Sequence, residues 1–291
     1  MLRLGTIPHT DYLRCSEAIQ LDLQHADTPC ELVEIPLHGI EKEANWRQTC
    51  LPALETALLR GEIDFFTWPL HELSPQRTEG TLIAGLSARS NPAAWLLANK
   101  QAADNGEMFS LKKEALAWAS IPVLGQQLQS FRPDVRLAAT APVRSTRELL
   151  DLFRQGAADA WLVPAADMVH LEGELDELDI TRFNPRELLP PPGCGVLAYL
   201  CCSNDLSTRS ILRGIHHPEV ALLTNVERKV LRLLGDARHA SIGVYCERDS
   251  SGYYHAWACL QTHGDTGPRH ARCSQSTHYH LSERIAEELL K

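Results

Sequence analysis

The chain has 291 residues, of which 44% are hydrophobic and 22% charged, with a formal net charge of −9. These proportions are typical of globular domains and argue against extended disorder. Nucleic-acid and anionic-membrane surfaces require clustered Lys and Arg, so the acidic balance argues against both kinds of partner.

The sequence also lacks the features of exported and membrane-spanning proteins. No apolar run approaches the roughly 20 residues that span a bilayer. The N-terminal segment Met1–Asp11 has no long apolar stretch and does not have the pattern of a signal peptide. Nine cysteines, an odd number without paired spacing, favour reduced thiols. We therefore expect a cytoplasmic protein that is a monomer or a weak oligomer.

Strands and helices are predicted to alternate over the first 90 residues. The strands are expected at 2–6, 31–36, 63–68 and 82–86, and the helices from about Thr10 and at 51–60. Such alternation predicts a largely parallel sheet with helices on its faces.

A second alternating unit is predicted to begin near residue 88. Its strands are expected at 93–98, 115–120 and 158–163, and its clearest helix at 145–154. Ser145 and Glu148 form a capping-box pattern at the start of that helix. The proline-rich segment 184–193 is the strongest turn and linker signal in the chain.

The C-terminal part has a different pattern. Residues 207–234 are predicted to be mainly helical, and 242–247, 253–260 and 271–275 are expected to form an antiparallel sheet. Asp249–Gly252 is the expected hairpin turn, and a helix at 281–290 is expected to pack on the sheet.

Four segments, in this order, resemble motifs of one known family. They are Leu2-Arg3-Leu4-Gly5-Thr6, Glu62-Ile63-Asp64-Phe65-Phe66, Leu189–Val196 and Asn225–Gly243. Their order and spacing resemble porphobilinogen deaminase (hydroxymethylbilane synthase), a transferase of tetrapyrrole and porphyrin biosynthesis, along nearly the whole chain.

The resemblance implies an α/β fold with three domains. Two are periplasmic-binding-protein-like α/β domains, expected at 1–88 with 179–203 and at 89–178. The third, at 204–291, is a small α+β domain with an antiparallel sheet, equivalent to the domain that carries the cofactor in the family.

The resemblance also points to a candidate catalytic residue. Glu72 occupies the position of an Asp that ends a Ser-Met-Lys-Asp-Val-Pro motif, and His71 occupies the Lys position. In the family this Asp stabilises the cationic azafulvene-like intermediate formed when porphobilinogen loses its amine. Glu72 keeps the charge with one more methylene. The alternative interpretation is a solvated residue that follows a strand.

The family binds the acetate and propionate groups of the growing polypyrrole with a row of arginines, because a guanidinium matches a carboxylate. Here those positions fall on Ile7, Val123, Leu124 and Ala141. Two cationic positions are kept, Arg147 and, opposite a lysine of a glycine-rich loop, Arg47. The residues expected to line the cleft between the first two domains are His9, Arg47, His71, Arg147 and Arg238.

Arg238 falls on the cysteine to which the family attaches its dipyrromethane cofactor through a thioether. An arginine forms no thioether. Cys194 falls on a glutamine of the family, and the cysteines in apolar strands are expected to be core residues. We therefore expect no dipyrromethane cofactor.

A metal site is also not expected. His278-Tyr279-His280 places two histidines at alternate positions, but no carboxylate or cysteine accompanies them in the sequence.

Three hypotheses follow. The first is a family member without the cofactor, inactive or altered in the family reaction, that binds a small ligand, pyrrole- or carboxylate-bearing, in the cleft between the domains. The second is an active transferase of the same pathway with unusual cofactor handling. The third is a non-enzymatic ligand-binding or regulatory module that closes on its ligand.

Overall fold

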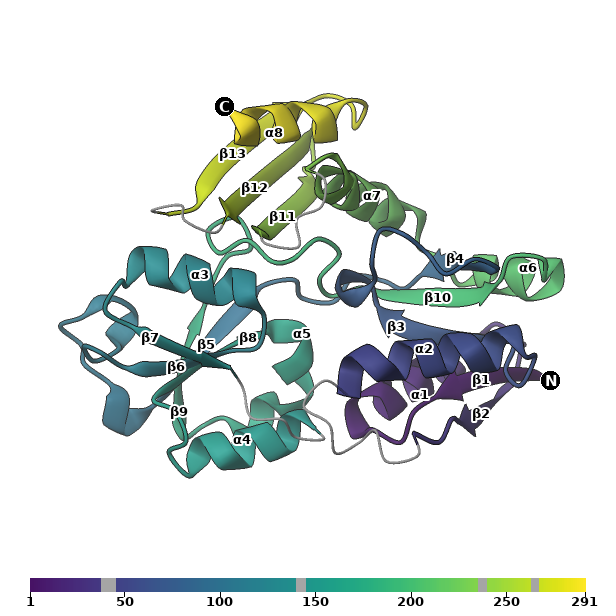
Figure 1. Ribbon diagram of the computed structural model, residues 1–291, viewed down its shortest axis with the longest axis horizontal. Helices are drawn as coiled ribbons and strands as arrows, with labels where there is room; N and C mark the ends of the chain where they lie inside the picture. The colour runs from purple at the N-terminus through teal and green to yellow at the C-terminus, as the bar shows by residue number, and fades with distance from the viewer. Residues whose placement is uncertain (38–45, 140–144, 235–239, 263–266) are drawn as a thin grey trace. The chain divides into compact units, whose positions relative to one another are not determined.

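The computed structural model describes residues 1–37, 46–139, 145–234, 240–262 and 267–291 (Figure 1). The chain forms two compact units. The first comprises residues 1–89, 142–146 and 196–221, and the second comprises 90–141, 147–195 and 222–291. None of the described helices is both long and apolar enough to cross a membrane.

The first unit is built on a five-stranded mixed sheet with the order β2-β1-β3-β10-β4. Its strands are β1 (Leu2–Thr6), β2 (Cys30–Glu34), β3 (Phe65–Pro69), β4 (Thr81–Leu86) and β10 (Leu197–Cys202). β1 is parallel to both β2 and β3, whereas β10 is antiparallel to β3 and β4. The chain therefore passes from β1 to its neighbour β2 on one side and then crosses to form β3 on the other side of β1.

Apolar side chains cover both faces of this sheet, as expected for buried parallel strands. Adjacent residues of β3 point to opposite faces: Phe66 lies in a core with Leu54 and Leu58 of α2 (Trp46–Leu59). Phe65 lies in a second core with residues of α1 (Thr10–His25) and α6 (Leu206–Gly214). The predicted alternation of strands and helices is confirmed here.

The second unit contains a sheet with the same arrangement, in the order β7-β6-β8-β5-β9. Its strands are β5 (Ala94–Asn99), β6 (Leu116–Ala119), β7 (Arg136–Ala139), β8 (Ala160–Pro164) and β9 (Leu178–Arg182). β7, β6 and β8 are parallel, β5 is antiparallel to β8, and β9 is antiparallel to β5. In both sheets, three parallel strands are followed by a fourth that is antiparallel to them and a fifth that is antiparallel to the fourth. The predicted pair of α/β domains is confirmed.

Helices cover the two faces of the second sheet. Val123, Leu124 and Leu128 of α3 (Pro122–Phe131) lie in the core of one face. On the other face, Phe153 of α4 (Thr146–Arg154) contacts the rings of Trp118 and Trp161. Shorter helices complete the unit: η3 (Lys100–Ala102), η4 (Met108–Ser110), α5 (Ala165–Met168) and η5 (Val169–Glu174).

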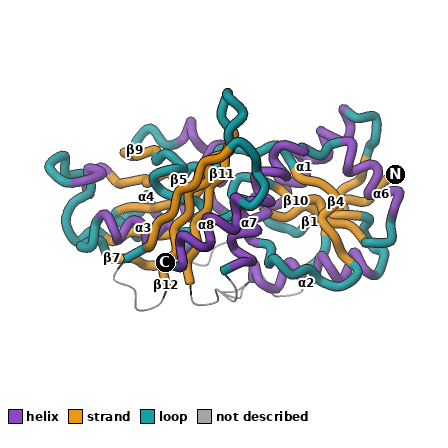
Figure 2. The backbone as a smooth tube through the Cα atoms, turned by 90° about the horizontal axis from the view of Figure 1, so that it is seen from above, coloured by secondary structure: helices purple, strands orange, loops and turns teal. Residues whose placement is uncertain are grey.

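The C-terminal part is an antiparallel sheet of β11 (Ala240–Arg248), β12 (Tyr254–Thr262) and β13 (Arg269–Gln275). α8 (Leu281–Leu290) and α7 (Pro218–Leu233) share a core with one face of this sheet, and Figure 2 shows β11, β12 and α8 together. The expected hairpin at Asp249–Gly252 is confirmed, with Gly252 at a φ of +87° and the Asp249 carboxylate accepting from two backbone N–H groups.

The chain returns from the second sheet to the first later than the expected boundary at residue 179. β9 pairs with β5, with Arg182 opposite Trp95, so residues 178–182 belong to the second sheet. The first unit resumes at Val196. The reason is that the turn and linker segment 184–193 follows β9, and only the strand after it, β10, pairs with β3.

Candidate functional site

The arrangement of the first sheet marks one edge as a candidate site. In open α/β sheets, ligands bind beyond the carboxyl ends of the strands, where neighbouring connections leave in opposite directions. β1 and β3 meet this condition, because β1 lies between β2 and β3 in the sheet. The chain beyond β1 enters α1, and the chain beyond β3 enters the 3-10 helix η2 (Leu70–Glu72). The first turn of α1 and Glu72 are therefore brought to the same edge.

Glu72 forms a specific contact at this edge. The phenol of Tyr12 donates a hydrogen bond to Glu72 Oε2 at 3.0 Å, although the two residues are 60 positions apart. The side chain of Glu72 is exposed. Among the described residues, the carboxylate of Glu72 forms no ion pair. The candidate residue thus carries a charge that is anchored through one oxygen.

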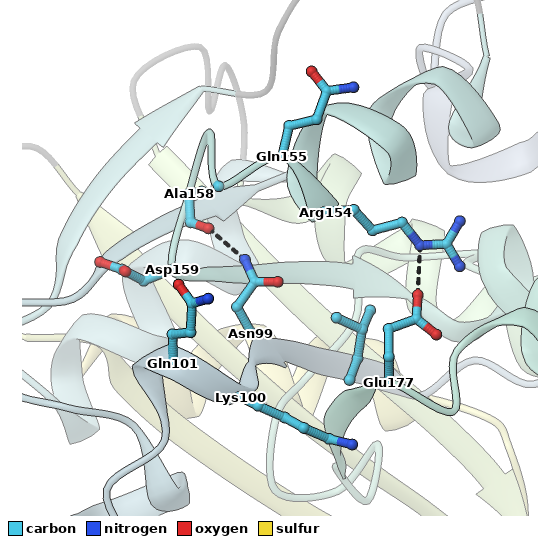
Figure 3. Close-up of a pocket in the computed structure, with 10 residues that line it drawn as sticks. Asn99, Lys100, Gln101, Arg154, Gln155, Ala158, Asp159 and Glu177 are labelled. Atoms are coloured by element: carbon cyan, nitrogen blue, oxygen red, sulfur yellow. Dashed lines mark hydrogen bonds and ion pairs between the residues drawn. The ribbon is translucent and has the colours of Figure 1, made fainter.

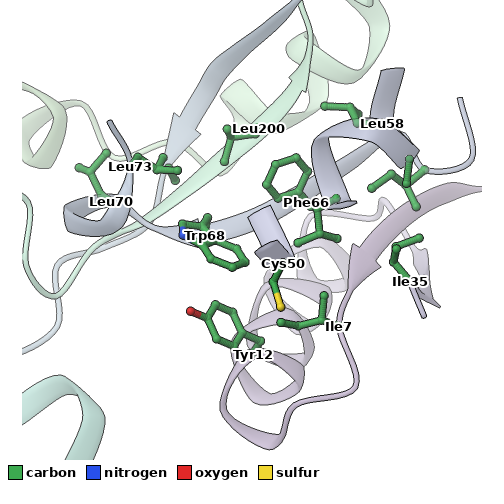
Figure 4. Close-up of a cluster of buried hydrophobic side chains, with 14 of the residues drawn as sticks. Ile7, Tyr12, Ile35, Cys50, Leu58, Phe66, Trp68, Leu70, Leu73 and Leu200 are labelled. Carbon is green, nitrogen blue, oxygen red and sulfur yellow. The ribbon is translucent and has the colours of Figure 1, made fainter. Parts of the chain in front are cut away.

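Tyr12 is held firmly by its own neighbours. Its side chain is only 7% exposed and belongs to the core between the sheet and α2. The ring lies 4.6 Å from that of Trp68 with an interplanar angle of 31°, and it meets His9 edge-on at 5.4 Å. Figure 4 shows Tyr12 beside Trp68 with its oxygen at the margin of the apolar cluster.

Sequence reasoning missed Tyr12. Its position in the first helical turn after β1 is a usable signal, because that turn must lie near the carboxyl end of the strand.

Asp11, next to Tyr12, is fully engaged. Its Oδ2 accepts hydrogen bonds from the backbone N–H and the hydroxyl of Thr146, both at 2.9 Å. Its Oδ1 accepts from Arg14 Nη2 at 3.1 Å. Asp11 is therefore engaged in contacts within the first unit. Of the two carboxylates, Asp11 and Glu72, only Glu72 is exposed.

The two histidines expected in the site lie near this edge. His9 is 6% exposed and is the N-cap of α1, where its Nδ1 accepts from the backbone N–H of Asp11 at 3.3 Å. His71 is half-buried and precedes Glu72 in η2. The structure thus places His9, His71 and Glu72 near the carboxyl end of the first sheet; their role in ligand binding stays a prediction.

The cationic positions that the resemblance keeps are not all described. Arg238 lies outside the described residues, and so does the side chain of Arg47, which belongs to α2. Arg147 is in the first turn of α4, where its guanidinium binds both carboxylate oxygens of Glu174 at 2.7 and 2.5 Å. Hydrogen bonding to Glu174 raises the pKa of Arg147, and the same contact lowers the pKa of Glu174. Arg147 is thus already paired with a carboxylate of its own unit.

Three positions expected to have lost an arginine are parts of the cores. Ile7 is 0% exposed and packs in the cluster of Figure 4. Val123 and Leu124 are 6% and 1% exposed and belong to the core beneath α3. Ala141 lies outside the described residues. At Ile7, Val123 and Leu124, buried apolar side chains stand where the resemblance implies guanidinium groups.

A pocket of about 520 Å³ in the second unit lies where β5 ends and where β8 and β9 begin (Figure 3). Three of its charged groups are paired within the protein: Arg154 Nε binds Glu177 at 2.5 Å, and Asp159 binds Lys112 at 2.7 Å. The amide of Asn99 donates to the carbonyls of Phe153 and Ala158. These contacts give the lining a structural role. Among the parallel strands, the pocket lies at the amino end of β8, opposite to the end at which α/β sheets bind ligands.

The His278-Tyr279-His280 segment lies at the start of the last helix. The ring of His278 meets Tyr254 edge-on at 5.7 Å, and His280 is the N-cap of α8. Within the described ranges, no three His, Cys, Asp or Glu side chains are grouped as metal ligands.

Comparison with known proteins identifies the family. The family model described as porphobilinogen deaminase, dipyromethane cofactor binding domain, matches residues 12–210. The chain belongs to the porphobilinogen deaminase family. The porphobilinogen deaminase of Thermobifida fusca is 30% identical over 254 residues, which cover 84% of this chain and 76% of that protein.

More distant relatives agree with this assignment. Porphobilinogen deaminase 1 of Streptomyces coelicolor is 28% identical over 232 residues, covering 77% of this chain and 70% of that protein. A probable porphobilinogen deaminase of Pyrobaculum calidifontis is 28% identical over 222 residues, covering 76% and 70%.

Among solved structures, a Salmonella typhimurium periplasmic binding protein with high arginine specificity aligns with a TM-score of 0.42 at 12% identity, covering 76% of this chain and 95% of that chain. An ancestral amino-acid-binding protein aligns with a TM-score of 0.42 at 15% identity, covering 74% and 87%. At these TM-scores neither likeness bears on the ligand of this chain.

Proposed function

We propose that this chain is a deaminase-family protein that does not assemble hydroxymethylbilane and instead binds a small ligand beside Glu72. The observation that carries the proposal is the burial of Ile7, Val123 and Leu124, which are 0%, 6% and 1% exposed. At these positions the resemblance implies arginines that bind the substrate carboxylates. An apolar side chain inside a core offers no donor to a carboxylate.

The cost of these replacements is large for a polyanionic substrate. A hydrogen bond to a charged group contributes roughly 1.5–3 kcal/mol. The resemblance implies that four guanidinium positions are replaced, of which Ile7, Val123 and Leu124 are described. Arg147 does not offset the loss as it stands, because Glu174 already binds both of its terminal nitrogens. Among the described residues at these positions, few cationic side chains would therefore be left to bind the acetate and propionate groups of such a ligand.

The residues present also do not fit a covalently attached dipyrromethane. Arg238 stands at the attachment position and supplies no thiol. Cys246 and Cys259, in the C-terminal sheet, are each 1% exposed, and burial raises the pKa of the Cys259 thiol to about 12. Because the thiolate is the nucleophile, a buried thiol of this kind is a poor substitute.

The first test is the intact mass of the protein purified from cells that make tetrapyrroles, followed by incubation with porphobilinogen. We expect the mass of the unmodified polypeptide and no consumption of porphobilinogen. The Thermobifida fusca deaminase, treated identically, is the positive control. A covalent dipyrrole adduct or the formation of bilane would overturn the proposal and support the active-transferase hypothesis.

Arg238→Cys separates the two kinds of loss. The variant restores a thiol but none of the carboxylate-binding arginines. We therefore expect it to acquire no dipyrrole adduct when it is incubated with porphobilinogen, as judged by intact mass. Adduct formation would show that the missing cysteine alone explains why no dipyrrole is attached.

A further inference from the structure

Tyr12 and Glu72 form a pair that the family motifs do not include. The pair joins the first turn of α1 to the end of η2 through the 3.0 Å hydrogen bond between the phenol and Glu72 Oε2. We propose that Tyr12 is a positioning residue that orients Glu72 to bind the N–H groups of a cationic, amine-bearing ligand without carboxylates. This inference rests on the proposed function of a small-ligand site at this edge.

The rigidity of the donor supports the positioning role. Tyr12 is 7% exposed and Trp68, against which it packs at 4.6 Å, is 2% exposed. A buried ring with two packed neighbours has one available orientation, so its hydroxyl is a fixed point at the margin of the core. Glu72, by contrast, is exposed, and an exposed glutamate loses rotamer entropy whenever it is held in one orientation. Because the fixed phenol of Tyr12 already restricts Glu72, less rotamer entropy of Glu72 remains to be lost when a ligand binds.

The bond also leaves part of the carboxylate for a ligand. Tyr12 binds Oε2 only, and an ionised carboxylate has two oxygens and about four acceptor sites. Within the described part of the chain, Glu72 has no cation as a partner. Oε1 is thus available to accept an N–H from an ammonium or from a ring nitrogen.

The surrounding charges favour a cation over an anion. Asp11 forms an ion pair with Arg14 and accepts two hydrogen bonds from Thr146, and the neighbouring position 7 is an isoleucine. Glu72 is therefore the uncompensated charge among the described groups named at this edge. A ligand that carries its own carboxylates would be repelled by Glu72, whereas an ammonium would gain a charge-assisted hydrogen bond.

Two ring-matched probes test the inference by isothermal titration calorimetry. 2-(Aminomethyl)pyrrole carries an ammonium and a ring N–H, and pyrrole-2-carboxylate has the same ring with an anion. We expect binding of the amine and none of the carboxylate. Glu72→Gln should weaken amine binding at least tenfold, and Tyr12→Phe, which keeps the ring, should weaken it about threefold to tenfold. Tyr253→Phe, at an exposed tyrosine of the second unit, is the matched control and should bind like the wild type.

The double variant distinguishes positioning from a merely structural role. If Tyr12 acts through Glu72, adding Tyr12→Phe to Glu72→Gln should not weaken amine binding further. The double variant should then bind the amine about as weakly as Glu72→Gln alone. Thermal melting of each variant checks that the fold is kept. Additive losses would overturn the positioning role.

Stronger binding of pyrrole-2-carboxylate, an amine affinity unchanged in Glu72→Gln, or no binding of either probe would overturn the ligand assignment. These outcomes differ from those that would contradict the proposed function, which are a dipyrrole adduct or the formation of bilane.

Discussion

Leu124 is 1% exposed and lies in the same core as Leu128, Ala117 and Leu162. Its neighbours fill the space that an arginine side chain would need, and no described carboxylate belongs to that core. We therefore expect that a single substitution to arginine does not create an anion-binding group here, because the surrounding core is apolar. The same reasoning applies to Ile7 in the first unit.

Leu124→Arg is therefore expected to destabilise the protein without restoring anion binding. Burying an unpaired charge beside α3 should lower the free energy of unfolding by about 3 kcal/mol or more. Leu124→Met keeps the volume and should cost less than about 1.5 kcal/mol. Urea unfolding curves of both variants and the wild type make the comparison. An unchanged midpoint for Leu124→Arg would show that position 124 is accessible to a charged group.

His216 provides a test at the same scale through pH. Its Nδ1 accepts a hydrogen bond from the backbone N–H of Leu86 at 3.0 Å, which requires that nitrogen to be unprotonated. Burial lowers the pKa of His216, and the charge of His217 adds to the effect. His216 therefore binds a proton more readily in the unfolded chain than in the folded chain. Its contribution to stability is complete above about pH 6.5, the ordinary pKa of histidine, and is lost as the pH falls below that value.

The measurement is the unfolding midpoint of the wild type and of His216→Asn between pH 5 and 8. Asparagine keeps an acceptor, Oδ1, in the place of Nδ1 but does not titrate. We expect the wild type to lose more stability than the variant as the pH falls. Parallel pH profiles would rule out a contribution from His216. The comparison is made between variants because burial also lowers the pKa of His270.

At the scale of elements, a buried carboxylate joins α7, β11 and the turn before β10. Glu227 of α7 is 0% exposed, and its oxygens accept from the backbone N–H groups of Gly193 and Cys246 at 2.8 and 2.9 Å. Gly243 shows how closely β11 approaches that segment. A Cβ at Gly243 would lie 2.7 Å from the carbonyl oxygen of Leu189 and 2.9 Å from Cys259 Sγ. The C-terminal sheet therefore packs on residues 189–193 with no room for a side chain at this point.

Removing the carboxylate of Glu227 should loosen this attachment. Glu227→Ala leaves two buried N–H groups without their acceptor and is expected to lower the free energy of unfolding by about 2 kcal/mol or more. Glu227→Gln keeps one acceptor oxygen and should cost less than the alanine variant. Urea unfolding, with amide hydrogen exchange at Gly193 and Cys246, measures both. Equal stability of the alanine variant and the wild type would contradict this role.

At the scale of the whole molecule, the two units repeat one sheet arrangement. Each has a parallel trio of strands followed by two antiparallel strands, although the order in sequence differs. In the first sheet the fourth strand is β10, which comes late in the chain, and in the second it is β5, which comes before the trio. The C-terminal sheet joins the second unit, since Cys259 of β12 lies in the core of α3.

The alternation of apolar segments predicted the strands and helices well, because their periodicity is local. The four motifs identified the family, and the position of Glu72 in its motif named the residue that forms the centre of the candidate site. The sequence did not predict the point of return from the second sheet, because the sheet to which a strand belongs is decided by its pairing, of β9 with β5 and of β10 with β3.

The sequence by itself therefore determined the fold class and the family. Only the tertiary structure decided that Tyr12 binds Glu72, that Ile7, Val123 and Leu124 are core residues, and that Arg147 is paired with Glu174. The physical reason is that these properties depend on contacts between residues far apart in the chain. Strand pairing and packing create those contacts, and local periodicity does not encode them.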